Sequence, residues 1–121
     1  MERTCLIMDL QKMANVIDGR IVANGIMSRT GYNTAFASDL MSDVLTLEQD
    51  NVVLITGLAT LQTIRTAEMA DINCIIFVRN KKVSPEMIRL ANEAGINLIE
   101  CRYSMFRASG LLYQAGLNPV Y

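Results

Sequence analysis

The sequence predicts an α/β domain whose mainly parallel β-sheet is covered by helices on both faces. From residue 51 onward, short apolar runs alternate with amphipathic segments in the order βαβαβα, which is typical of right-handed crossovers between parallel strands. The runs at residues 52–55 and 74–78 are continuously apolar, as in strands that are buried on both faces. Because 121 residues is the length of one ordinary domain, we predict a single domain over residues 1–121.

The second half of the chain contains the clearest elements. Three apolar runs predict strands, at residues 51–56, 74–78 and 96–99. Three amphipathic segments predict helices, at residues 60–70, 84–95 and 104–114. Each helix has a hydroxyl residue at its start that can cap it, namely Thr60, Ser84 and Ser104. We expect Ile55, Ile76 and Leu98 to be buried in adjacent central strands.

The first half of the chain is less regular. Its hydrophobic spacing predicts helices over residues 6–17 and 39–47 and strands at residues 20–23 and 32–37. Ser38 or Asp39 can cap the helix over residues 39–47. We expect the two strands to join the sheet in mixed orientation.

Composition excludes several functions. Histidine is absent, which excludes Ser–His and Cys–His nucleophile pairs and His-ligated zinc. Three cysteines without a CxxC motif predict no disulfide framework and a reducing, cytoplasmic location. A net charge of −1 provides no field that would attract nucleic acid or an anionic membrane. No apolar run reaches the roughly 18–20 residues of a membrane helix, and we expect neither a metal nor a cofactor.

The leading candidate site follows the first buried strand of the second half. Thr56, Gly57 and Thr60 lie where this strand gives way to a helix. Unpaired N–H groups at a helix N-terminus attract anions, and α/β sheets collect ligands at the carboxyl ends of their strands. These residues can therefore contact an anionic ligand. The alternative is that Gly57 only permits a tight turn and that Thr60 only caps its helix.

A second candidate comprises Arg29, Thr30 and Gly31, followed by Ser38 and Asp39. The arginine guanidinium suits phosphate or carboxylate because it forks onto two oxygens, and glycine allows the backbone to approach closely. We predict that a ligand pocket would bring Arg29, Thr30 and Gly31 close to the strand-end turn described above. The alternative is a polar turn in which Arg29 pairs with a local acid such as Asp39.

Three further patterns carry weaker signals, each with a structural alternative. Asp39 and Asp43 are four residues apart and can hold magnesium or merely lie on a helix surface. The loop at residues 79–82 carries three basic side chains, which suit either an anion contact or a solvated turn. Residues 102–107 interleave arginine with aromatic residues, as in a surface that stacks bases. Because the charge is balanced and no basic face is present, a packed helix is the favoured interpretation.

The order and spacing of three stretches resemble the DRTGG domain family. These stretches are residues 29–44, 54–69 and 104–113. Residues 28–32 match the five-residue motif for which the family is named: Arg29, Thr30 and Gly31 are retained. Ser28 replaces the aspartate of the motif, and Tyr32 replaces its second glycine. Loss of the acid weakens any metal-binding role for the motif.

The resemblance implies a three-layer α/β/α sandwich similar to the N-terminal domain of HPr kinase/phosphorylase. In that family the domain accompanies phosphotransacetylases and CBS-domain pyrophosphatases without carrying their catalytic residues. We therefore hypothesise a stand-alone, non-catalytic regulatory or ligand-sensing domain that binds a small anionic ligand or nucleotide. We expect a homodimer whose interface includes the C-terminal helix and the apolar tail at residues 116–121. The alternatives are a scaffold or accessory subunit of a partner enzyme and, less favoured, a phosphotransfer enzyme.

Overall fold

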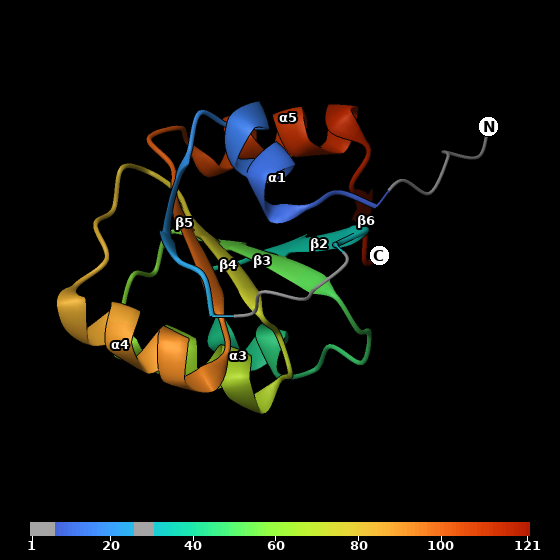
Figure 1. Cartoon of the computed structure of the whole chain (residues 1–121). Helices are drawn as coiled ribbons and strands as arrows, with labels where there is room; N and C mark the ends of the chain where they lie inside the picture. Colours follow the sequence, from blue (N-terminus) through green and yellow to red (C-terminus); the bar gives the residue numbers. More distant parts are fainter. Residues whose placement is uncertain (1–6, 26–30) are drawn as a thin grey trace.

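A computed structural model describes residues 7–25 and 31–121. The described residues form a sheet with the strand order β1-β5-β4-β3-β2-β6 (Figure 1). Its strands are β1 (Arg20–Ala23), β2 (Thr34–Ala37), β3 (Val52–Thr56), β4 (Cys74–Phe77), β5 (Asn97–Glu100) and β6 (Asn118–Pro119). All neighbouring strands are parallel except β1, which is antiparallel to β5. The prediction of a mixed, mainly parallel sheet is confirmed.

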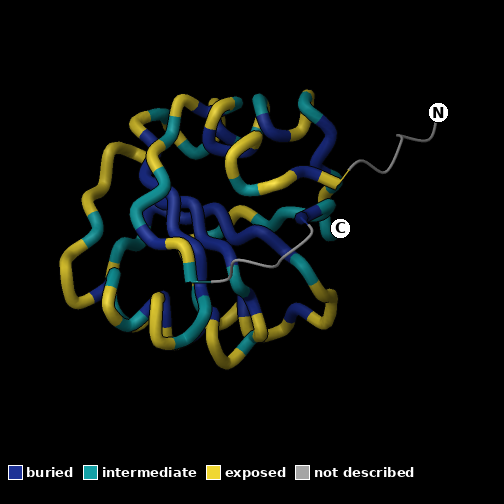
Figure 2. Tube along the Cα trace, in the orientation of Figure 1, coloured by how far each residue is buried: buried dark blue, intermediate teal, exposed yellow. Residues whose placement is uncertain are grey.

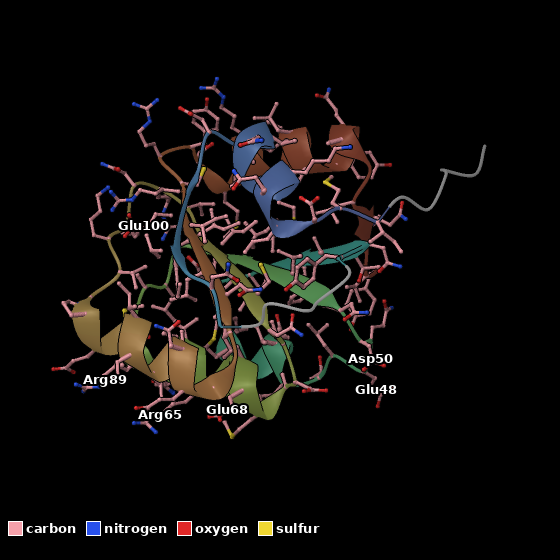
Figure 3. All side chains as sticks on the ribbon, viewed as in Figure 1. Glu48, Asp50, Arg65, Glu68, Arg89 and Glu100 are labelled. Atoms are coloured by element: carbon pink, nitrogen blue, oxygen red, sulfur yellow. The ribbon has the colours of Figure 1, made fainter. Side chains whose placement is uncertain are left out.

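Helices cover both faces of this sheet and complete the expected three-layer arrangement. They are α1 (Leu10–Val16), α2 (Met41–Val44), α3 (Leu61–Met69), α4 (Pro85–Ala94) and α5 (Met105–Ala115). In Figure 1, α1 and α5 lie above the sheet, whereas α3 and α4 lie below it. The charged side chains of Arg65, Glu68 and Arg89 lie on the outer side of α3 and α4 (Figure 3). No helix in residues 7–25 and 31–121 has the length and hydropathy needed to cross a membrane.

Alternating side chains on the central strands divide the interior into two cores. Ile55 and Ile76 belong to the core beneath α1 and α5. Leu54, Ile75 and Leu98 belong to the core formed with α2, α3 and α4. Figure 2 shows these central strands as buried throughout. The prediction that Ile55, Ile76 and Leu98 are buried in adjacent strands is therefore confirmed, with Leu98 on the opposite face from the two isoleucines.

The predicted caps at Thr60, Ser84 and Ser104 are formed by local hydrogen bonds, whereas neither Ser38 nor Asp39 caps α2. The hydroxyls of Thr60, Ser84 and Ser104 each accept a hydrogen bond from the backbone N–H three residues later, at 3.1–3.2 Å. These bonds satisfy donors that the first helical turn leaves unpaired. Gly95 ends α4 in the left-handed region, with φ of 73°, which favours glycine.

The helix predicted over residues 39–47 is shorter than expected and forms only α2, which begins at Met41. The reason lies in the two preceding side chains. The Ser38 hydroxyl accepts a hydrogen bond from the Leu40 N–H at 3.0 Å, and the Asp39 carboxylate bonds to residues at the end of β3. Asp39 therefore precedes the helix and does not share a helical face with Asp43.

The helix predicted over residues 6–17 also begins later, at Leu10; residue 6 lies outside the described residues. Met8 forms an antiparallel bridge with Tyr32, with both backbone N–H···O distances at 2.8 Å. Because this bridge holds the backbone of Met8, α1 begins only after the N-cap residue Asp9. The Asp9 carboxylate then caps α1 by accepting a hydrogen bond from the Lys12 N–H at 2.7 Å.

The C-terminal tail is better covered than expected from its sequence. Leu117 is buried in the core beneath α1 and α5, with only 2% of its surface exposed. Val120 packs against the other core, and β6 adds the tail to the edge of the sheet beside β2. Of the apolar tail residues, Tyr121 remains largely exposed.

Replacing Ile76 with alanine is expected to lower the free energy of unfolding by about 2–5 kcal/mol, because it leaves a cavity beside the β3 and β5 side chains. Urea titration followed by circular dichroism measures this loss. Met69→Ala, at the exposed end of α3, is the control and is expected to change stability by roughly 0.5 kcal/mol or less. A loss below about 1 kcal/mol for Ile76→Ala would contradict its central position.

Candidate functional site

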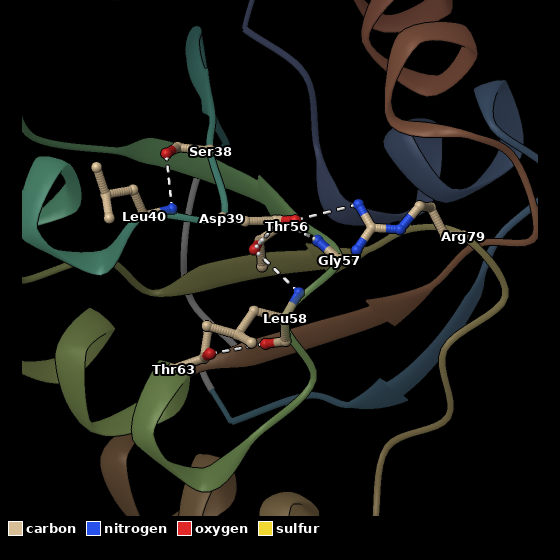
Figure 4. A network of polar contacts seen from close by, with 8 residues as sticks. All are labelled: Ser38, Asp39, Leu40, Thr56, Gly57, Leu58, Thr63 and Arg79. Carbon is tan, nitrogen blue, oxygen red and sulfur yellow. Dashed lines mark hydrogen bonds and ion pairs between the residues drawn. The ribbon is translucent and has the colours of Figure 1, made fainter.

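A carboxylate occupies the carboxyl end of β3. Asp39 lies two residues after β2, the strand that pairs with β3. Its Oδ1 atom accepts hydrogen bonds from the Gly57 backbone N–H at 2.7 Å and from the Thr56 hydroxyl at 2.9 Å (Figure 4). The strand-end turn that was expected to attract an anion therefore already holds one, supplied by the chain itself.

Arg79 completes this network from the end of the next strand. It follows β4 by two residues, and its Nη1 atom lies 3.1 Å from Asp39 Oδ2. The hydrogen bond from Gly57 lowers the pKa of the Asp39 carboxyl below its usual range, and the Thr56 hydroxyl and the Arg79 guanidinium act in the same direction. Burial opposes these effects and raises the pKa. The Asp39 and Arg79 side chains are both partly exposed, which limits the strength of their ion pair.

The Arg79 guanidinium packs closely against Gly57. A Cβ atom at this position would displace the guanidinium from its present place. The next backbone donor is also used internally, because the Leu58 N–H donates to the Thr56 hydroxyl at 3.2 Å. The Leu58 carbonyl accepts a hydrogen bond from the Thr63 hydroxyl at 2.6 Å. The turn is thus hydrogen-bonded to the first turn of α3. The N–H groups of Gly57 and Leu58 both donate to oxygens of the protein itself.

The structure brings together Ser38, Asp39, Thr56 and Gly57 from the predicted site. Thr60 lies at the start of α3, where its hydroxyl caps the helix and lies 3.1 Å from the Thr63 hydroxyl. These contacts match the alternatives in which Gly57 permits a tight turn and Thr60 caps its helix. A ligand role for these residues stays a prediction.

Gly31 lies apart from this group. It precedes β2, which runs parallel to β3, so it lies near the amino end of β3 rather than the carboxyl end. The five residues of β3 separate the two edges, or roughly 16 Å at about 3.3 Å per residue. The predicted approach of Gly31 to Gly57 is therefore wrong. Arg29 and Thr30 lie outside the described residues.

Sequence reasoning did not place Arg79 in this site. The sequence pattern that contains Arg79 is the basic loop at residues 79–82, for which a solvated turn was the favoured interpretation. Arg79 has a left-handed backbone, with φ of 63°, and its N–H donates to the Tyr103 carbonyl at 2.8 Å. Because Asp39 and Arg79 are 40 residues apart, only the adjacency of β2, β3 and β4 brings them together.

A second feature lies on the face of the sheet that α5 covers. An apolar groove of about 360 Å³ runs between α5 and the neighbouring strands β2 and β6. Ala35 and Ala37 of β2 line it, and α5 contributes Phe106, Gly110 and Tyr113. Phe106 is 90% exposed. The groove has few polar groups of its own, so it suits an apolar partner better than a charged ligand.

No family model matches the chain, and no curated protein matches its sequence. Among solved structures, the chain is similar to the CBS and DRTGG domains of the regulatory region of Clostridium perfringens pyrophosphatase, in complex with the activator diadenosine tetraphosphate. The TM-score is 0.77 at 15% sequence identity, and the match covers 90% of this chain and 47% of that chain. The chain therefore has a DRTGG-like α/β fold, as the sequence resemblance implied.

Replacing Asp39 with asparagine is expected to change how stability depends on pH. The folded pKa of Asp39 is lower than its unfolded value, near 3.8. Its ionised form therefore stabilises the fold above about pH 4, and this contribution is lost as the pH falls through the folded pKa. The stability difference between wild type and Asp39→Asn should shrink from about pH 6 to about pH 2 in urea titrations. A difference that stays constant over this range would contradict the assignment.

Proposed function

We propose that this chain is a non-catalytic regulatory domain that senses a small anionic ligand and acts as a homodimer. The DRTGG-like fold supports a regulatory role, because the similar structure comes from a regulatory region in complex with an activator nucleotide. The observation that carries the proposed association is the apolar groove beside α5. Ligand sensing and association together describe a domain that reports metabolite levels to a partner.

The side-chain chemistry favours this role over a phosphotransfer or hydrolytic enzyme. The whole sequence has no histidine to act as a general base. Burial raises the pKa of the Cys74 thiol to about 12, and it also raises the pKa of Cys101. Both thiols are therefore protonated near neutral pH and are poor nucleophiles.

One face of α5 forms a wall of the groove and carries an exposed aromatic side chain. Phe106, Gly110 and Tyr113 follow one another at helical spacing along a single face of α5. A Cβ atom at Gly110 would meet no heavy atom within 4 Å, so there is open space beside this part of the helix face. In a two-fold dimer, each copy can place its Phe106 in the groove of the other.

Packing within one chain leaves the Phe106 side chain exposed. A dimer of this kind would bury it. A buried phenylalanine removes a large apolar surface from water, and aromatic residues are enriched at protein interfaces. The small side chains of Ala35 and Ala37 keep the strand side of the groove open. A second copy of this chain is therefore the occupant that we propose for the groove.

Replacing Phe106 with glutamate is expected to separate the dimer, because it puts a charge into an apolar contact. Light scattering on size-exclusion eluates at micromolar concentration should give twice 13.4 kDa for the wild type and 13.4 kDa for Phe106→Glu. Since Phe106 is 90% exposed, the fold should tolerate the change. Met69→Glu is the matched control, on the opposite face of the sheet, and should remain dimeric.

Two results would count against this proposal in different ways. A wild-type particle of 13.4 kDa would contradict the homodimer and favour the alternative of an accessory subunit that docks on another protein. A Phe106→Glu variant that stays dimeric would show that the chain associates through another surface.

A further inference from the structure

A polar pocket of about 200 Å³ opens at the carboxyl ends of β4 and β5. Three separate segments form it: the chain after α1 with the first residue of β1, the loop after β4, and the end of β5 with the residues that follow. Its charged lining residues are Asp18, Arg20, Lys81, Lys82, Glu100 and Arg102. The carboxyl edge of a parallel sheet is where α/β domains collect ligands.

Glu100 organises the inner part of this pocket. It ends β5 and is only 7% exposed. Its Oε1 atom lies 3.1 Å from Arg20 Nη2 and 3.9 Å from Lys82 Nζ, while Oε2 accepts a hydrogen bond from the Val83 N–H at 2.8 Å. One buried carboxylate therefore holds two cations and fixes the loop that leads to α4.

The loop that carries the lysines is also fixed at its other end. Arg79 and Asn80 both have left-handed backbones, with φ of 63° and 58°. The Arg79 N–H donates to the Tyr103 carbonyl at 2.8 Å, and the Asn80 N–H donates to the Cys101 carbonyl at 3.1 Å. The loop after β4 is thus hydrogen-bonded to the chain after β5, which preorganises the pocket between them.

Positive charge exceeds negative charge in this pocket. Four cationic side chains line it, against the two carboxylates of Asp18 and Glu100. Arg102 pairs with Asp18 at 2.9 Å, but both side chains are well exposed, so the pair is weak and a ligand can compete for the guanidinium. Within residues 7–25 and 31–121, Lys81 forms no ion pair.

We propose that this pocket binds the phosphate groups of a small molecule through Lys81, Arg102 and the two cations beside Glu100. The inference rests on the proposed ligand-sensing function, for which it names a site and a ligand class. Arginine forks onto phosphate oxygens, and lysine adds a compact charge. The volume of about 200 Å³ leaves room for a mono- or diphosphate group. The turn at Gly57 is a poorer site for a phosphate group, because the Gly57 N–H already donates a hydrogen bond to the Asp39 carboxylate.

Isothermal titration of the full chain with pyrophosphate at low ionic strength tests the proposal. We expect saturable binding with one site per chain, which weakens as salt is added. Lys81→Ala and Arg102→Ala should each raise the dissociation constant roughly tenfold, because each removes a charge-assisted hydrogen bond. A parallel titration with a nucleoside triphosphate distinguishes the source of the phosphate: tighter binding than that of pyrophosphate indicates a nucleotide.

Arg89→Ala and Lys12→Ala are matched controls for the two variants. Both residues are exposed, and Figure 3 shows Arg89 on α4, away from Glu100. Each control removes the same charge as the variant that it matches, and each should bind pyrophosphate like the wild type. Equal melting temperatures of all variants, measured without ligand, would show that the fold is retained.

The outcomes separate this inference from the proposed function. If pyrophosphate binds the wild type but Lys81→Ala and Arg102→Ala bind it equally well, the assignment of the pocket is overturned while ligand sensing stands. If neither pyrophosphate nor the nucleotide binds the wild type, the phosphate class is overturned. The light-scattering result on Phe106→Glu does not depend on either outcome.

Discussion

Burial of β3, β4 and β5 on both faces is the constraint on which the rest of this structure depends. Every residue of these three strands is buried. Helices must therefore cover both faces of the sheet, and alternate side chains must serve two separate cores. The polar residues that these strands do contain, Thr56, Asn97 and Glu100, stand at strand ends. Asp39, Arg79 and Glu100 all lie at the carboxyl edge of the parallel strands.

Neighbouring strand ends use similar groups in different ways. At the end of β3, the Asp39 carboxylate accepts hydrogen bonds from the Gly57 N–H and the Thr56 hydroxyl. These donors are therefore already bonded to an anionic group of the chain itself. At the end of β5, the Glu100 carboxylate is buried among cations that outnumber the nearby acids. Surplus positive charge therefore remains at the second strand end, where solvent can reach it. For this reason we propose the ligand site in the pocket beside Glu100 and not at the Gly57 turn.

The helix α5 has two apolar sides with separate roles. Ala108 and Leu112 face the core and are buried, whereas Phe106 and Tyr113 face outward beside the groove. Arg102, on the rim of the polar pocket, lies four residues before Phe106. The proposed ligand site and the proposed dimer face are therefore joined by one short segment of chain.

Local sequence patterns correctly predict the central strands and the starts of α3, α4 and α5. Continuous apolar runs predict strands buried on both faces, and the caps at Thr60, Ser84 and Ser104 bond to a residue only three positions away. The candidate sites could not be predicted in this way, because the residues that form each site lie far apart in the chain and only the fold brings them together. Asp39 and Arg79 are 40 residues apart, and Arg20 and Glu100 are 80 apart. Such pairs depend on which strands are adjacent, in which direction and in which register, and short-range sequence patterns do not contain that information.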